Sequence, residues 1–271
     1  MPVNSGNALV AMAHELSTLF TGRKQIMLDE VDSTNTKMFS IIQHGVLPEG
    51  TVVRADFQLG GKGQGQNTWH SEHGKNLLAS FLFRLDFIAT EEIFVWNKAV
   101  ALAIYDAIQL FAGNSERVKI KWPNDIYVDD YKLGGLLIEN SIAGTTLRQS
   151  VVGIGINVNQ TEFPDEIPNP ISLIQVLGVA VEVSSVLNEI ANALERRYLQ
   201  CKRKDYTALK SEYQQHLYRL NKKSLLEADG RNFTGTITGV NENGQLQVQL
   251  EDGNVRAFEL KQIRFLNTIS E

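Results

Sequence analysis

Residues 58–80 read Gln58-Leu-Gly-Gly-Lys-Gly-Gln-Gly-Gln-Asn-Thr-Trp-His-Ser-Glu-His-Gly-Lys-Asn-Leu-Leu-Ala-Ser80, and the rest of the chain is organised around this stretch. Four glycines fall within six residues near its start, so the backbone has little steric preference and its N–H groups can approach a ligand closely. Lys62 adds a cation among the glycines, and Trp69 adds an aromatic plane just beyond them. A surface loop would account for the glycines but not for the tryptophan. Together these residues suit a phosphate that is joined to a flat base.

Two familiar phosphate-binding motifs do not match this loop. The nucleotide P-loop needs two glycines separated by four residues and followed by Lys and then Ser or Thr, an order that is absent here. The dinucleotide fingerprint needs G-x-G-x-x-G between a strand and a helix. In this chain the third glycine comes one residue early, and the apolar run from Leu77 to Leu85 predicts a strand after the loop. The glycine-rich loop therefore belongs to another class of site.

Composition places the chain among ordinary globular proteins. Its 271 residues are 43% hydrophobic and 21% charged, enough for one large domain with a small satellite. The net charge of −5 argues against a nucleic-acid-binding protein. Cys201 is the only cysteine, which excludes an internal disulfide and a cysteine-built zinc site. With no signal peptide in view, and with polar residues interrupting the apolar segment 93–112, we expect a cytoplasmic protein with a buried helix there and no membrane span.

The first half of the chain predicts alternating strands and helices. A short helix is expected at Leu9–Phe20, a strand at Ile26–Val31 and a helix at Thr36–His44. Between the last two lies Asp32-Ser33-Thr34-Asn35, whose residue types cap helices. A plain cap is one interpretation, and hydroxyls offered to a small polar ligand are the other. A second strand, Gly50–Phe57, leads into the glycine-rich loop, and a helix with small residues at helical spacing is expected at Glu92–Phe111.

Further along, Val118–Val128 contains Lys121-Trp122-Pro123-Asn124-Asp125. Pro123 cannot donate a hydrogen bond within a sheet, so we expect two strands joined by a kink that aims Lys121 and Asn124. The strand expected at Lys132–Glu139 contains Gly134 and Gly135, which suggests a bulge or the close approach of a ligand. The strand expected at Val151–Val158 contains Gly153 and Gly155 and should pass near something bulky. Helices are expected at Val186–Gln200 and Tyr206–Leu220.

The last fifty residues have a different sequence pattern. Short apolar runs alternate with Asp229-Gly230, Asn243-Gly244 and Asp252-Gly253, and each of these pairs is a hairpin signal. We therefore expect a small β-barrel at 221–271, after a larger domain at 1–220.

The order of these motifs resembles that of the biotin protein ligases (biotin–[biotin carboxyl carrier protein] ligases). The resemblance runs from about Ile26 to Asn159, and Lys121-Trp122-Pro123-Asn124-Asp125 is its most specific part. It implies an α+β fold, with a mixed sheet flanked by helices as in class II aminoacyl-tRNA synthetases and biotin–lipoate ligases, and a C-terminal SH3-like barrel. The start looks too short for the DNA-binding domain of the bifunctional repressor members, so the monofunctional class is expected.

The resemblance also implies a reaction. Such enzymes use Mg²⁺ with ATP to convert biotin to biotinyl-5′-adenylate, release pyrophosphate, and transfer biotin to one lysine of a carboxylase's carrier domain. Lys121 and Lys62 are the catalytic residues that the resemblance implies. It assigns biotin to Ser33, Thr34, Asn35, Gln58, Lys62, Gly63, Gln64, Lys121 and Gly134. It assigns ATP and the adenylate to Gly61, Lys62, Gly63, Gln64, Trp69, Asn124 and Asn157. It identifies no metal-binding residues, and biotin, ATP and the carrier domain are the expected partners, without DNA or membrane and with a homodimer as one oligomeric state.

The loop departs from the family pattern Gly-Arg-Gly-Arg-x-Gly-Arg-x-Trp. Lys62, Gln64 and Asn67 stand where arginines are common, and Gln66 stands where a glycine is. Fewer charged contacts to the adenylate are therefore expected. Two alternatives share part of the pattern: a lipoate–protein ligase or octanoyltransferase of the same architecture, and a non-catalytic binder of biotin or of the carrier protein.

Overall fold

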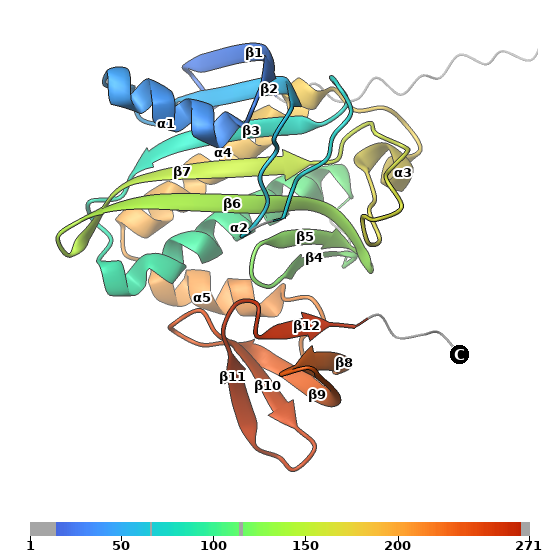
Figure 1. Cartoon of the computed structure of the whole chain (residues 1–271). Helices are drawn as coiled ribbons and strands as arrows, with labels where there is room; N and C mark the ends of the chain where they lie inside the picture. Colours follow the sequence, from blue (N-terminus) through green and yellow to red (C-terminus); the bar gives the residue numbers. More distant parts are fainter. Residues whose placement is uncertain (1–14, 66, 114–115, 267–271) are drawn as a thin grey trace, which may run out of the picture.

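The computed structural model describes residues 15–65, 67–113 and 116–266 (Figure 1). Its larger part is a seven-stranded sheet in the order β1-β2-β3-β7-β6-β5-β4. β1 runs parallel to β2, and the other neighbours are antiparallel, so the sheet is mixed, as expected. In chain order the strands are Gln25–Val31 (β1), Val52–Gln58 (β2), Leu77–Arg84 (β3), Val118–Lys121 (β4), Asp125–Val128 (β5), Tyr131–Ala143 (β6) and Thr146–Ile156 (β7).

Helices cover both faces of this sheet (Figure 1). Because side chains alternate along a strand, Val53 and Leu82 pack with Met38 of α1 (Thr34–His44) on one face. Their neighbours Val52 and Phe81 belong to the main core on the other face. That face is covered by α2 (Ile93–Phe111), α4 (Val183–Lys202) and α5 (Tyr206–Gln215); a 3-10 turn, η1 (Thr90–Glu92), precedes α2, and α3 (Leu173–Leu177) is short.

α2 is the central core helix. Together with η1 it is long and apolar enough to cross a membrane by length and composition. Most of its residues, from Val95 to Ile108, are nevertheless buried within the protein, against α4, α5 and the sheet. The expectation of a buried helix in this segment is confirmed.

The C-terminal residues form a second, five-stranded antiparallel sheet in the order β11-β10-β9-β8-β12. Its strands are Lys223–Ala228 (β8), Arg231–Val240 (β9), Leu246–Leu250 (β10), Val255–Phe258 (β11) and Ile263–Phe265 (β12). Positive φ angles of 53° at Asp229 and 70° at Gly230 form the tight turn that this residue pair predicts. Closure of the sheet into an SH3-like barrel, the synthetase-like relationship of the larger sheet, and the boundary between 1–220 and 221–271 stay predictions.

The two sheets are in direct contact. The Trp122 indole Nε1 donates to the Gly244 carbonyl at 2.8 Å. A methyl group at Gly244 would approach Phe94 Cγ of α2 to 2.7 Å, so this hairpin packs closely against the core helix. The C-terminal sheet is thereby held beside β4 and β5 (Figure 1).

Some expected helix limits were wrong. Residues 15–20 are not helical, and the rest of the helix expected at Leu9–Phe20 lies outside the described residues. The expected helix Tyr206–Leu220 ends at Gln215, because the chain turns there to pair with Ile120 of β4. Sequence periodicity could not reveal this contact, whose partner lies far away in the chain.

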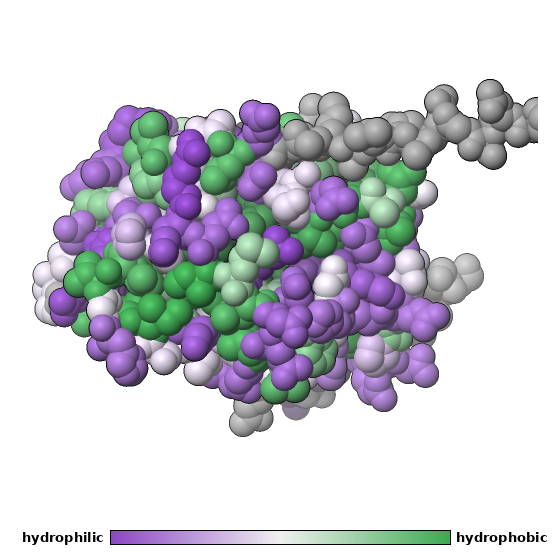
Figure 2. Space-filling view, turned by 90° about the horizontal axis from the view of Figure 1, so that it is seen from above, coloured by the Kyte–Doolittle hydropathy of each residue, from purple (hydrophilic) through white to green (hydrophobic). Residues whose placement is uncertain are grey.

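One face of the protein shows how hydrophobic and hydrophilic residues are distributed over the surface. Seen from above in Figure 2, hydrophobic residues (green) form patches among hydrophilic ones (purple). Met27 on the edge strand β1 and Ile142 near the β6–β7 turn are among the large apolar residues that are exposed.

Candidate active site

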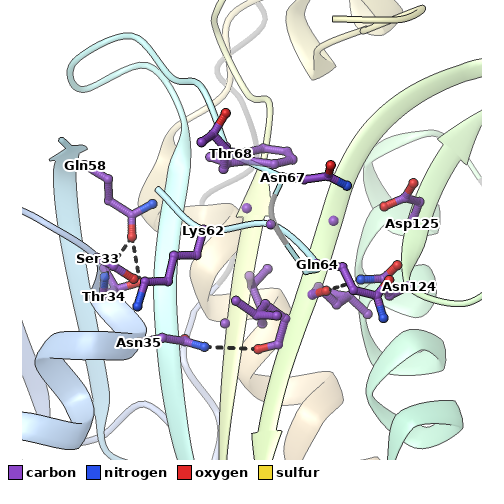
Figure 3. A pocket seen from close by; sticks show the side chains of 18 of the residues that line it. Ser33, Thr34, Asn35, Gln58, Lys62, Gln64, Asn67, Thr68, Asn124 and Asp125 are labelled. Carbon is purple, nitrogen blue, oxygen red and sulfur yellow. Dashed lines mark hydrogen bonds between the residues drawn. The ribbon is translucent and has the colours of Figure 1, made fainter. Parts of the chain in front are cut away.

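A cavity of about 200 Å³ opens where the N-terminus of α1, the end of β2 and the glycine-rich loop meet β6 and β7 (Figure 3). It is lined by Ser33, Thr34, Asn35, Gln58, Lys62, Gly63, Gln64, Asn67, Thr68, Trp69, Pro123, Asn124, Asp125, Lys132, Gly135, Leu136, Leu137, Gly153, Ile154 and Gly155. The structure therefore brings most of the residues expected for biotin and ATP into one place. Lys121, Gly61, Gly134 and Asn157 are the expected site residues that do not line it.

The N-terminus of α1 contributes a hydroxyl-rich end. Ser33 is the N-cap residue, yet its side chain makes no capping hydrogen bond. Thr34 donates to Gln58 Oε1 through its backbone N–H at 2.8 Å and its hydroxyl at 3.0 Å. Ser80 Oγ lies 2.7 Å from Thr34 Oγ1. The tetrapeptide is thus a helix start whose hydroxyls are not consumed by capping.

Gln58 is oriented by these contacts. Its carbonyl oxygen accepts both hydrogen bonds from Thr34, so the amide nitrogen is left to donate elsewhere. Figure 3 shows Gln58, Ser33 and Thr34 grouped on one side of the cavity. A side chain at Gly61 would come within 3.2 Å of Gln58 Nε2, which explains why glycine suits that position although Gly61 does not line the cavity. The side chains of Ser33, Thr34 and Gln58 are uncharged hydrogen-bonding groups, and we call these three residues the neutral end of the cavity.

Asn35 also lines the cavity, but its amide is held by the sheet. Nδ2 donates to Glu139 Oε2 at 2.7 Å and to the Leu137 carbonyl at 3.2 Å, and Oδ1 accepts from Ser80 Oγ at 2.5 Å. A methyl group at Gly153 would lie 2.9 Å from Asn35 Cγ. The prediction that Gly153 passes something bulky is confirmed. Asn35 links α1 to β6, and its place among biotin-binding residues stays a prediction.

The glycine-rich loop folds back as a narrow hairpin. Gly63 N donates to the Asn67 carbonyl at 2.8 Å, and Trp69 N donates to the Gly61 carbonyl at 2.8 Å. Lys62 is directed toward α1, where its Nζ donates to Thr36 Oγ1 at 3.0 Å. The loop's one lysine therefore lies at the hydroxyl-rich end of the cavity.

Trp69 lies flat against the strand glycines. A methyl group at Gly155 would come within 2.9 Å of Trp69 Cζ2, and one at Gly135 within 3.5 Å of Cζ3. Side chains alternate along β6, so Gly134 faces away, toward Ile156, and only Gly135 reaches the cavity. Gly134 therefore does not line the cavity, and its expected contact with biotin stays a prediction. Glycine at 135 and 155 leaves room for the indole ring.

The opposite end of the cavity carries charge. Lys132 Nζ pairs with Asp125 Oδ1 at 2.8 Å, and both side chains are partly exposed. The ammonium lies 5.9 Å from the centroid of the Trp69 ring. Asn124 donates to the Leu136 carbonyl at 2.5 Å, which fixes the start of β5 beside β6. Sequence reasoning missed Lys132; its place just before Leu133-Gly134-Gly135 on a predicted strand was the available signal.

Lys121 lies outside this cavity, at the end of β4 and two strands away from β6. Its Nζ donates to Tyr127 Oη at 2.8 Å and lies 5.3 Å from the centroid of the Phe265 ring. Burial lowers the pKa of the Lys121 ammonium to about 8, although Asp125 opposes the shift. The edge of the sheet carries Lys121 into the adjoining hollow, and its expected contact with biotin stays a prediction.

That hollow is a second space of about 640 Å³. It shares Asn67, Thr68, Trp69, Asp125 and Lys132 with the first cavity. It adds His70, Lys121, Tyr127, Asn157, Phe163, Glu166, Ile167, Pro168, Pro170 and Arg264. Asn157 is buried there and donates to the Ile171 carbonyl at 3.0 Å. The two spaces adjoin at Asp125 and Lys132, so two ligands could be held next to each other there.

Comparisons with known proteins agree with this geometry. Residues 27–157 match the model of the biotin/lipoate A/B protein ligase family. The bifunctional ligase/repressor BirA of Bacillus subtilis is 30% identical over 241 residues, which cover 88% of this chain and 73% of that protein. The biotin–[acetyl-CoA-carboxylase] ligase of Paracoccus denitrificans is 28% identical over 228 residues, covering 81% and 92%.

A solved structure is similar over nearly the whole length. The biotin protein ligase from Aquifex aeolicus, in complex with biotin and ATP, superposes with a TM-score of 0.74 at 26% identity, covering 91% of this chain and 100% of that one. The same arrangement of sheet and helices is thus found in a protein that binds both ligands. The chain belongs to the biotin/lipoate A/B protein ligase family and, within it, to the biotin protein ligases, which are enzymes.

Proposed function

We propose that this enzyme joins biotin to one lysine of a carboxylase's carrier domain, through biotinyl-5′-adenylate. The observation that carries the proposal is the cavity itself, with neutral donors at Gln58 and a charged border at Lys132. Biotin has a neutral ureido ring at one end and a carboxylate at the other, so its polarity matches that of the cavity.

The ureido ring fits the neutral end. Its carbonyl oxygen needs donors, and the amide nitrogen of Gln58 is left to supply one. Its N–H groups need acceptors, and the Ser33 hydroxyl is not used in capping. Apolar surface from Leu136 and Leu137 and the plane of Trp69 line the space between the two ends. Buried polar groups that fit a particular partner reject a ligand that cannot pair with them.

The charged end suits the reacting groups. A carboxylate placed beside the Lys132 ammonium would lie next to the second hollow, where an α-phosphate can be held. Lys121 borders the same hollow, together with Trp69 and Asn157. Lysines whose charge is partly desolvated stabilise negative charge on phosphate oxygens more than they would in water.

The chemistry follows from bringing two anions together. An oxygen of the biotin carboxylate attacks the α-phosphorus, the bond to the β-phosphate bridging oxygen breaks, and pyrophosphate leaves. The carrier lysine amine then attacks the acyl carbon, loses a proton, and AMP leaves. Neither step needs a protein nucleophile, and the Cys201 thiol is buried, with its pKa raised to about 12 by burial. The enzyme contributes position and charge.

Mg²⁺ is proposed to enter with ATP. No group of three or more His, Cys, Asp or Glu side chains in the described segments could hold a metal ion. Asp125 is a carboxylate shared by both spaces, and Mg²⁺ is commonly held by one or two carboxylates together with substrate phosphates. Asp125 could therefore hold a Mg²⁺ ion that arrives bound to the nucleotide, and this ion would neutralise the phosphates.

Several further properties belong to the same proposal. We infer a cytoplasmic enzyme that acts without a membrane and, in line with its net charge of −5, without DNA. The edge strand β1, with Met27 exposed, supports pairing between two copies as a homodimer. Sedimentation of the purified protein tests this, since a dimer sediments faster than a monomer of 30.3 kDa.

One assay separates the proposal from its alternatives. Pyrophosphate release is measured with ATP and either biotin or lipoate, and transfer is measured with a biotin carrier domain. Release that requires biotin supports the proposal. Release with lipoate instead, or binding of biotin without any release, would replace it with the lipoate ligase or the non-catalytic binder.

A further inference from the structure

The tip of the glycine-rich loop carries no charge of its own. Gln64, Gly65 and Asn67 form the described part of the tip, and Gly65 has a φ of 71°. Lys62 is the only lysine or arginine between residues 58 and 70, and its ammonium donates to Thr36 of α1, beside the neutral end of the cavity. A phosphate beneath the tip would therefore meet amides but no cation from the loop.

A lysine of the C-terminal sheet reaches this tip. Lys261 lies in the turn between β11 and β12. A methyl group at Gly65 would lie 2.8 Å from Lys261 Cε and would overlap its Nζ. The ammonium therefore lies directly against the loop backbone, at a position where a larger residue would displace it.

Hydrogen bonds hold the turn that carries Lys261 in place, and the Glu259 carboxylate of this turn is bonded to a glutamine. The Glu259 backbone N–H donates to Gln262 Oε1 at 2.8 Å, and Gln245 Nε2 donates to Glu259 Oε1 at 2.7 Å. Among the residues that the structure describes, no carboxylate forms an ion pair with Lys261. By contrast Arg264, on the adjoining strand, is paired with Glu227. The Lys261 ammonium is thus not neutralised by a carboxylate of the described residues, and its turn is held by hydrogen bonds.

We infer that Lys261 is a positioning residue that holds the loop tip closed over the ligand and supplies, from the second sheet, the positive charge that the tip lacks. The inference rests on the proposed function, because the ligand is an acyl-adenylate, a mixed anhydride with one negative charge on its phosphate, or a phosphodiester analogue of it with the same charge. The C-terminal sheet thereby contributes to retaining the reactive intermediate until the carrier lysine arrives.

The experiment uses biotinol-5′-AMP, an unreactive phosphodiester analogue, and measures its dissociation rate from the full-length protein. Lys261→Met keeps the length of the side chain and removes its charge, whereas Lys261→Arg keeps the charge. Lys223→Met is the matched control, because Lys223 is an exposed lysine on β8 of the same sheet that pairs with Glu251. Biotin affinity is measured in each variant as a second readout.

We expect Lys261→Met to release the analogue about fivefold faster at low salt, the factor for roughly 1 kcal/mol. Lys261→Arg and Lys223→Met should release it at the wild-type rate, and biotin affinity should be unchanged in all three. The difference should shrink at high salt, because ions screen an exposed charge. Equal dissociation rates in wild type and Lys261→Met would overturn this inference alone. Failure of the wild type to bind the analogue would overturn the proposed function and this inference with it.

Discussion

At one end of the cavity the uncharged side chains of Thr34, Gln58 and Ser80 are linked by hydrogen bonds, with the Lys62 ammonium bonded to Thr36 nearby, whereas at the other end Lys132 and Asp125 form a partly exposed ion pair. The neutral end is built from a helix start and two sheet strands; Thr34 and Ser80 are buried and Gln58 is half-buried. The charged end is shared with a second, larger space. Figure 3 shows Thr34 and Gln58 on the opposite side of the cavity from Asp125. Under the proposed function, one end selects the ligand and the other performs the chemistry.

The largest effect on the reaction rate should come from removing the Lys132 charge at the charged end of the cavity. Lys132→Ala should lower the rate of biotin-dependent pyrophosphate release by about a hundredfold, the cost of one lost contact to a developing oxyanion. Lys121→Ala is the comparison, since Lys121 lies in the second space only and should cost less. Initial rates at saturating substrates measure both. A greater loss in Lys121→Ala would reverse the assignment of the two lysines.

A larger residue behind Trp69 should displace its indole ring, which lies between the two ends of the cavity. Gly155→Ala places a methyl group within 2.9 Å of the indole, and overpacking of this kind costs roughly 1–3 kcal/mol. We expect a lower melting temperature and a higher KM for ATP. Gly45→Ala is the matched control, because nothing lies within 4 Å of its added methyl. An unchanged melting temperature would show that the loop moves aside freely.

At the neutral end the effect should fall on binding. Gln58→Ala removes a donor and leaves the Thr34 N–H without its partner, so biotin affinity should drop about tenfold. The rate of pyrophosphate release at saturating biotin should change little. Calorimetric titration and initial rates measure the two quantities. A fall in rate with unchanged affinity would contradict the division between the ends.

Charge added to the loop tip should act on retention. Gln64 lines the cavity on the side of Asn124, and Gln64→Arg should slow adenylate dissociation by about fivefold, because a charged hydrogen bond contributes roughly 1 kcal/mol more than a neutral one. Stray biotinylation of bystander lysines should fall in parallel. If Lys261 already compensates for the missing charge, the added arginine should act most clearly in the Lys261→Met background.

The smallest effect concerns pH. Burial lowers the pKa of Lys121 from 10.5 to about 8, so its ammonium form is lost as pH rises through 8. Because this charge is proposed to hold the nucleotide, the KM for ATP should rise about twofold between pH 7 and pH 8, in line with a group that is half deprotonated at its pKa. Lys121→Met should remove this pH dependence. The sign for stability is opposite: the cost of burying the charge is present below pH 8 and disappears at higher pH.

Much of the fold could be predicted because its signals are local. The strands around Ile26–Val31 and Val151–Val158, the C-terminal hairpins and the close contacts of Gly153 and Gly155 all follow from periodicity or from residue type. Short-range patterns of this kind need no knowledge of distant partners.

The remaining site residues depend on register and on strand order. Gly135 reaches the cavity and Gly134 does not, because a single step along β6 reverses the direction of the side chain. Lys132 and Lys121 are separated by the order β6-β5-β4, which the sequence does not specify. The Asn35–Glu139 hydrogen bond joins residues 104 positions apart, and the approach of Lys261 to Gly65 joins the two sheets. These contacts exist only after the chain has folded.

A crystal structure of the protein with biotin tests the division between the two ends most directly. The account predicts that the ureido oxygen lies within hydrogen-bonding distance of Gln58 Nε2 and that the carboxylate is nearest to Lys132 Nζ, beside the second space. Biotin bound in the reverse direction, or with its carboxylate nearest to Lys62 and Thr36, would contradict it.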